Sequence, residues 1–198
     1  MYQPQRLALK FGRMLLTLSL IAGGFVSHAT AAAEKDLEAK VKAAYLFHLT
    51  KFVDWPTLPP NEVRICILGS EAVGGMMGDI SNRMVRNRPL KIEVDAISDP
   101  AQCQVLFIGR SEKRLSELIK RLHGANVLTV SDLEDFTRRG GMVGFFVDAG
   151  KLRLEINPEN ARAGNLRISA KLLELARIGS LPRYLIMARS GPVPAVWH

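Results

Sequence analysis

The sequence has little of what catalytic and metal sites require. Its 198 residues include two cysteines and four histidines, and aromatic residues make up 7%. It contains no G-x-S-x-G nucleophile elbow. Its glycine-rich stretch 69–76 lacks the lysine and the Ser/Thr with which a P-loop holds phosphate and magnesium. Two cysteines alone cannot complete a zinc site. We therefore expect a protein that is not an enzyme and that binds no metal or cofactor.

A base for nucleophilic catalysis is also hard to find. Only His48 and His123 lie in the central part of the chain. His48 falls on the apolar stripe of a predicted helix, which favours a packed or hydrogen-bonded histidine. His123 is expected at a helix C-terminus, where a cation interacts favourably with the helix dipole. A hydrolase that uses either histidine remains a functional hypothesis, ranked below the two that are given later in this section.

The N-terminus has the pattern of an export signal. Residues 1–13 carry three basic and no acidic residues, residues 14–26 are almost wholly apolar, and residues 27–33 are rich in small residues. Thirteen apolar residues are fewer than the roughly 20 that span a membrane. We expect a signal peptide over residues 1–33, cleaved after Ala31 or Ala33, a domain over 34–179 and a tail over 180–198. The mature protein is then periplasmic, with no transmembrane segment.

Basic residues outnumber acidic ones by a moderate margin. Loss of residues 1–33 removes three basic residues from a net charge of +8 and leaves +5. Basic runs at 83–91 and 110–121 are expected to be solvated faces, or alternatively a surface for an acidic partner. Arg110 and Arg114 are our candidates for such contacts. With few aromatics and no binding motif, nucleic acid is not an expected partner.

Cys66 and Cys103 are the two cysteines of the chain. In an oxidising compartment an even pair suggests a disulfide. A bond that closes this loop of 37 residues stabilises the fold by about 4 kcal/mol in the chain-entropy model.

Periodicity predicts an α/β fold. A helix over 35–54 precedes strands at 63–68, 90–96, 103–108 and 127–130, which alternate with helices. The first two of those helices start at Ser70 and Ser111, and an S-x-x-E capping box at 131–134 starts the third. A hairpin over 142–156 turns at Gly150, and Asn157 and Ser169 cap two last helices, 158–163 and 170–178. Such alternation gives a mostly parallel sheet covered on both faces, here with an antiparallel edge hairpin.

Two glycine turns follow predicted strands. Gly69 and Ser70 come after the first strand, and Gly109 comes after the third. Folds of this class bind ligands at the carboxyl edge of the sheet, and helix N-termini attract anions. A small-molecule site at these residues is therefore the alternative function, and a plain strand-to-helix turn is the simpler interpretation.

Three segments together resemble the YfiR family of periplasmic proteins. They are 41–56 (VKAAYLFHLTKFVDWP), 65–69 (ICILG), and 140–145 with 154–157 and 168–177, so that the likeness extends over residues 37–178. The resemblance implies a Rossmann-like three-layer α/β/α domain, often dimeric, so a homodimer is expected. It also implies repression of a membrane-bound diguanylate cyclase through the periplasmic part of that enzyme, which lowers cyclic di-GMP and with it biofilm formation. Cys66 and Cys103 match the linking pair of the family, whereas a second cysteine pair found near the hairpin in some members is absent here.

Aromatic residues gather at the end of the first predicted helix. Tyr45 and Phe52 fall on its buried stripe, which leaves Phe47 and Trp55 as the candidates for a surface that binds the partner.

Overall fold

The computed structural model describes residues 26–179, with side chains from Ala31 onward. Contacts divide the chain into two units, one up to Glu38 and one from Ala39. The described part of the first unit is helical, and it includes both predicted cleavage points within α2 (Val26–Phe52). Most of the predicted leader and the whole of the predicted tail lie outside the described residues, so cleavage stays a prediction.

From Ala39 onward, the buried face of α2 only partly coincides with the predicted stripe. Leu49 of that stripe is buried and Tyr45 and Phe52 pack against the core, but Ala44 and His48, also on the predicted stripe, are exposed, while Ala43 and Leu46 beside it are buried. The expectation of a packed His48 is therefore wrong. The buried face also contains two polar side chains, Lys42 and Thr50.

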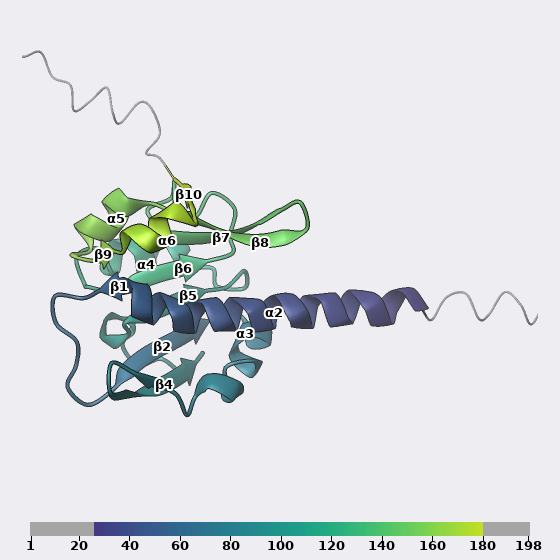
Figure 1. The fold of residues 1–198 in the computed structure, drawn as a ribbon, viewed down its shortest axis with the longest axis horizontal. Coiled ribbons are helices and arrows are strands. Elements are labelled where there is room, and N and C mark those ends of the chain that lie inside the picture. The colour runs from purple at the N-terminus through teal and green to yellow at the C-terminus, as the bar shows by residue number, and fades with distance from the viewer. Residues whose placement is uncertain (1–25, 180–198) are drawn as a thin grey trace, which may run out of the picture. The chain divides into compact units, whose positions relative to one another are not determined.

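One sheet of eight strands forms the centre of the second unit, in the order β10-β8-β7-β6-β5-β2-β4-β3. The strands are β2 (Val63–Leu68), β3 (Met84–Val85), β4 (Arg88–Val94), β5 (Val105–Ile108), β6 (Leu128–Ser131), β7 (Val143–Asp148), β8 (Lys151–Ile156) and β10 (Arg177–Ile178). Pairing is parallel from β4 through β2, β5 and β6 to β7. Figure 1 shows this succession of strands, which confirms the predicted mostly parallel sheet.

The antiparallel hairpin is confirmed with its turn. β7 pairs with β8 through Asp148 and Lys151, and the two residues between them, Ala149 and Gly150, have φ of 46° and 72°. Positive φ at both central residues is the mark of the type I′ turn that suits hairpin twist. The hairpin does not form the edge, because β10 pairs in parallel with the outer side of β8.

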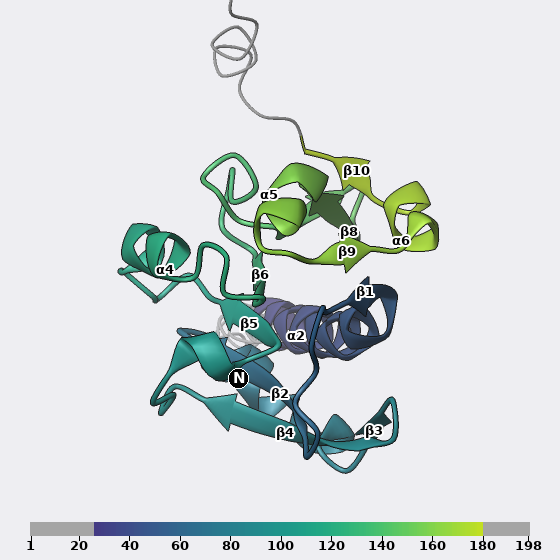
Figure 2. The ribbon, with the colours of Figure 1, turned by 90° about the vertical axis from the view of Figure 1, so that its left-hand side faces the viewer.

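Both faces of the sheet are covered. Alternate residues of β2 point to opposite sides, so Ile65 and Ile67 join one cluster while Cys66 and Leu68 join another. The first cluster includes the buried side chains of α2, and the second includes those of α4 (Leu115–Arg121). Figure 2 shows α4 and α2 on opposite sides of the strands. A small second sheet, which was not predicted, pairs β1 (Val53–Asp54) with β9 (Arg167–Ile168).

Several predicted helices are shorter than expected. The helix after Ser70 is α3 (Glu71–Gly75), followed by a 3-10 turn at Gly78–Ile80, because glycine-rich sequence weakens helix continuation. A further 3-10 turn, Pro100–Gln102, precedes β5. The last helix, α6 (Ala170–Glu174), starts at its predicted cap Ser169 but gives way to β10. By contrast, α5 (Pro158–Ala163) starts and ends as predicted, with Asn157 as its cap.

Two predicted helix caps, Ser131 and Ser111, do not cap helices in the structure. The capping box at 131–134 starts no helix, and turns occupy residues 134–140. Ser131 ends β6, and its hydroxyl donates to the Ile108 carbonyl and accepts from the Leu133 N–H. Ser111 does not cap α4, because that helix starts at Leu115 with Arg114 in the cap position; the Ser111 hydroxyl donates to the Gly69 carbonyl at 2.7 Å. In both cases the serine hydroxyl donates to a carbonyl that is distant in sequence.

Candidate functional site

The glycine turns at the carboxyl edge of the sheet contact each other directly. A Cβ on Gly109 would lie 2.2 Å from the Gly69 carbonyl oxygen and 2.6 Å from Cβ of Ser70. Gly69, at φ 66°, donates its N–H to Asp95 Oδ1 at 2.9 Å, and the Gly109 N–H donates to the Leu68 carbonyl at 2.7 Å. The predicted ligand-binding residues thus come together, but the amide donors of both glycines are already engaged within the protein.

Beside these turns lies a charged cluster that joins α2 to the end of β6. Lys42 Nζ lies 2.5 Å from Asp132 Oδ2, and the two side chains are only 7% and 14% exposed. Arg110 approaches the same carboxylate oxygen at 3.7 Å with its Nε and donates to the Asp132 backbone carbonyl at 3.3 Å. The pair links α2 to the residue that follows β6. Loss of either member would leave the other as an uncompensated buried charge, which is strongly destabilising.

Arg110 and Arg114, the predicted partner-binding arginines, are 75% and 63% exposed. Arg114 pairs with Glu112 at 3.0 Å, and Arg110 belongs to the charged cluster. The hydrogen bonds from the Arg114 side chain and backbone lower the pKa of Glu112. The same pairing raises the pKa of Arg114. Both guanidinium groups are thus accessible to a partner.

Phe47 and Trp55 do not lie on the surface. They are 3% and 7% exposed and belong to the core cluster that contains α2, so their prediction as surface aromatics is wrong. Two cations cover the Phe47 ring, with Lys51 Nζ at 4.5 Å and the Arg83 guanidinium at 5.3 Å from its centroid. Aromatic side chains at a helix end more often belong to the core than to an interface, and here both Phe47 and Trp55 lie in the core.

The cysteine pair forms a disulfide. Cys66 in β2 and Cys103, two residues before β5, have Cα atoms 6.0 Å apart, and both residues are fully buried among the apolar side chains that face α4. The bond links two neighbouring strands of the parallel sheet, as the sequence predicted.

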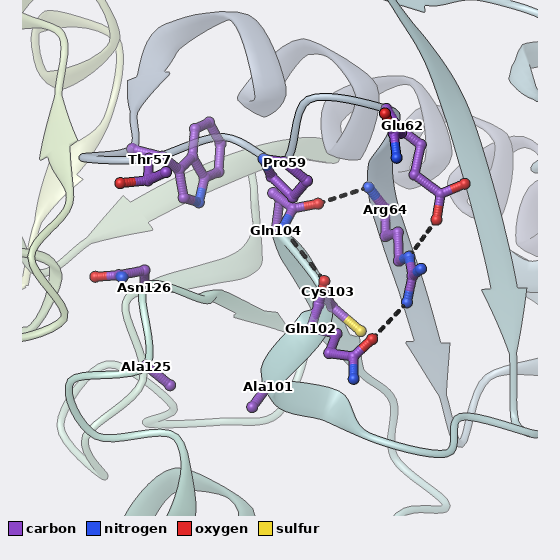
Figure 3. A pocket seen from close by; sticks show the side chains of 12 residues that line it. Thr57, Pro59, Glu62, Arg64, Ala101, Gln102, Cys103, Gln104, Ala125 and Asn126 are labelled. Atoms are coloured by element: carbon purple, nitrogen blue, oxygen red, sulfur yellow. Dashed lines mark hydrogen bonds and ion pairs between the residues drawn. The ribbon is translucent and has the colours of Figure 1, made fainter.

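A cavity of about 530 Å³ opens at the opposite, amino edge of the sheet. Its walls come from the loop after β1, the start of β2, the segment before and into β5, and the turn before β6; Figure 3 shows the residues: Trp55, Thr57, Pro59, Asn61, Glu62, Arg64, Ala101, Gln102, Cys103, Gln104, Ala125 and Asn126. Our sequence reasoning missed this cavity. The wall residues come from three stretches of the chain, 55–64, 101–104 and 125–126, which carry no shared motif, so no local signal marks them.

Exposed apolar side chains gather near the hairpin and β10. Val147, Leu175 and Ile178 are more than half exposed. Arg177 stacks its guanidinium 3.8 Å from the centroid of the Phe146 ring and pairs with Glu155 at 3.0 Å. Aromatic and arginine side chains are frequent anchors of protein interfaces.

Among residues 26–179, no helix is both long and apolar enough to cross a membrane. Within the same range, no three His, Cys, Asp or Glu side chains stand close enough to hold a metal ion.

Comparison with known proteins gives one family. The profile described as DUF4154, YfiR/HmsC-like, matches residues 39–177, which is most of the chain. No curated protein matches the sequence.

Proposed function

Because the chain belongs to the YfiR/HmsC-like family, we propose that it is a periplasmic regulator that represses a membrane-bound diguanylate cyclase. It binds the periplasmic part of the cyclase and so lowers cyclic di-GMP. The family match over residues 39–177 carries this proposal. The Cys66–Cys103 disulfide supports the compartment, since such bonds persist in oxidising environments and are rare in the cytosol.

Contact with the cyclase is assigned to Arg110 and Arg114. Both guanidinium groups are exposed, and rim charges guide association between proteins. Charge reversal in Arg110→Glu and Arg114→Glu weakens recovery of the cyclase from solubilised inner membrane. The matched control is Arg121→Glu, an exposed arginine on α4 that pairs with Asp99 at 3.0 Å. Equal recovery with all three variants contradicts the assignment.

The deciding experiment measures cellular cyclic di-GMP in a deletion strain and in the same strain complemented. Deletion is expected to raise cyclic di-GMP, and the full chain restores the low level. A version without residues 1–33 does not restore it if the protein acts in the periplasm. Unchanged cyclic di-GMP on deletion refutes the proposed function.

Two finer expectations accompany this proposal. The family resemblance supports a Rossmann-like three-layer arrangement and a homodimer. Sedimentation equilibrium of the purified protein tests the dimer, and a single monomeric species would contradict it.

The alternative function, a small-molecule site at Gly69, Ser70 and Gly109, receives less support. The backbone amides of the two glycines donate to partners within the protein. A thermal-shift series with phosphate and sulfate tests an anion at this edge, and absence of stabilisation would dismiss it.

A further inference from the structure

The end of α2 and the hairpin of β3 and β4 carry an excess of positive charge. This hairpin is the edge of the sheet opposite to β10, as Figure 2 shows. Residues 47–54 and 83–88 together contain four basic side chains and one acidic side chain, a net charge of +3. The four basic side chains are Lys51, Arg83, Arg86 and Arg88, and we call them the basic patch.

Two cations of the basic patch are held over one aromatic ring. Lys51 Nζ lies 4.5 Å and the Arg83 guanidinium 5.3 Å from the centroid of the Phe47 ring. Phe47 belongs to the core, so the ring is a fixed support for both cations. Both basic residues are exposed, and among the described side chains neither forms an ion pair. The structure thus presents two accessible positive charges that no carboxylate of the domain neutralises.

The other two cations are fixed by the β3–β4 turn. Arg86 and Asn87, the central residues of this turn, have φ of 49° and 63°, as a type I′ turn requires. Arg86 Nη2 donates to the Val53 carbonyl at 2.9 Å and to Asp54 Oδ1 at 2.8 Å, which holds the turn against the end of α2. The partly buried Arg88 donates from Nη1 to the Arg86 carbonyl at 3.2 Å. Asp54 therefore balances only one cation of the patch.

An exposed apolar side chain lies in the same edge strand. Met84 is 55% exposed, whereas its neighbour Val85 in β3 is 1% exposed and packs in the core with Phe47. Alternation along a strand turns Met84 to the other side of this edge. Segments that lie on membranes combine lysine and arginine with apolar side chains that enter the boundary between headgroups and acyl chains.

We propose that this edge of the domain binds the surface of a membrane that contains anionic phospholipid. Lipid phosphates lie against Lys51 and Arg83, and the Met84 side chain enters the headgroup boundary. A single small anion would meet only the two cations, whereas a layer of lipid reaches both sides of the edge strand at once. The contact would hold the domain at a membrane, but it does not depend on the proposed repression of a cyclase.

Sedimentation with lipid vesicles tests the proposal on the purified protein, prepared from the periplasmic fraction in the form that export yields. One set of vesicles contains two parts phosphatidylcholine and one part phosphatidylglycerol, and the other contains phosphatidylcholine alone. We expect stronger binding to the anionic vesicles, and we expect that added salt weakens it because the charges lie at the surface. Failure of this test leaves the cyclic di-GMP experiment unaffected, since no cyclase is present in the vesicles.

Charge removal at the patch is expected to weaken this binding. Each basic residue near an anionic surface contributes about 5-fold to the partition, so Lys51→Gln/Arg83→Gln lowers it about 25-fold. The matched control is Lys113→Gln/Lys120→Gln, which removes two exposed cations in or near α4, on the opposite side of the strands from α2 (Figure 2). Both double variants lose the same net charge, and any contribution of the N-terminal residues is common to all the proteins compared.

The apolar contact has its own variant. Met84→Ser is expected to lower the partition about 3- to 10-fold, since part of an apolar side chain no longer leaves water. Leu175→Ser is its control, because Leu175 is 73% exposed but lies beside β10, at the other edge of the sheet. Circular dichroism verifies that each variant is folded.

Four results overturn the proposal. The first is equal binding to anionic and neutral vesicles. The second is an equal loss in Lys51→Gln/Arg83→Gln and in the α4 control. The third is a partition of Met84→Ser no lower than that of Leu175→Ser. The fourth is displacement from the vesicles by soluble poly-glutamate but not by the same charge concentration of chloride, which would assign the patch to an acidic protein segment.

Discussion

The buried pair Lys42–Asp132 gives the sharpest prediction about stability. Replacement of Lys42 by methionine keeps a long unbranched side chain with similar helix propensity but removes the ammonium group. The Asp132 carboxylate, 14% exposed, then loses its partner at 2.5 Å. The change therefore isolates the charge from the packing.

The size of the effect follows from the surroundings. Removal of one member of a buried ion pair costs about 3–5 kcal/mol. Arg110 remains 3.7 Å from the same oxygen, at the surface, so Lys42→Met is expected at the lower end, about 3 kcal/mol. The double variant Lys42→Met/Asp132→Leu leaves no buried charge of this pair and returns to within about 1 kcal/mol of the parent.

Urea denaturation followed by far-ultraviolet circular dichroism measures these differences. With a slope of about 2 kcal/mol per molar, a loss of 3 kcal/mol lowers the midpoint by about 1.5 M. Arg121→Ala is the control, because its pair with Asp99 is 56% and 37% exposed and such pairs contribute about 0–1 kcal/mol. The reasoning is refuted if Lys42→Met costs no more than this control, or if the double variant is as unstable as Lys42→Met.

Three further predictions concern the disulfide, a glycine contact and pH. The double variant Cys66→Ala/Cys103→Ala unfolds with about 4 kcal/mol less free energy, because a loop of 37 residues is no longer closed in the unfolded chain; urea midpoints that coincide would contradict this. Gly109→Ala costs about 1–3 kcal/mol or more through its collision with backbone, whereas Gly75→Ala, with open space around its Cβ position, stays within about 0.5 kcal/mol; equal melting temperatures for the two would count against the contact. The pKa of Glu112 is lowered from its ordinary 4.5 by its arginine neighbour, so the stability that it adds is present above pH 4.5 and is lost as pH falls through the folded value; Glu112→Gln should flatten stability on the acid side of a pH series, and identical curves would disprove the link.

Much of the fold could be predicted because local patterns decide it. The strand 63–68 matches β2 in full, because a short and mainly apolar run followed by a glycine turn is typical of a buried strand. The turn at Ala149–Gly150 and the caps Asn157 and Ser169 also depend only on residues within one turn. The disulfide could be predicted from composition, since the only two cysteines of a chain with a predicted export signal are expected to pair.

The candidate site was less accessible to prediction. Gly69 and Gly109 were expected near one another, and they are, but only the three-dimensional contact reveals that their amides are engaged. Phe47 was assigned to the surface because it lies off the predicted apolar stripe of α2, and Trp55 because it follows that helix; the tertiary structure buries both in the core.

By itself the sequence determined the class of the fold, the cysteine pair and the family resemblance, because these depend on residue type, short-range periodicity and order along the chain. The tertiary structure alone decided which face of α2 is buried, since that face includes Lys42, which pairs with Asp132, ninety residues later in the chain. It also decided that Ser131 ends a strand and starts no helix; there its hydroxyl donates to the carbonyl of Ile108 on the neighbouring strand. Contacts between distant segments compete with local preference, and where they are stronger, they set the structure.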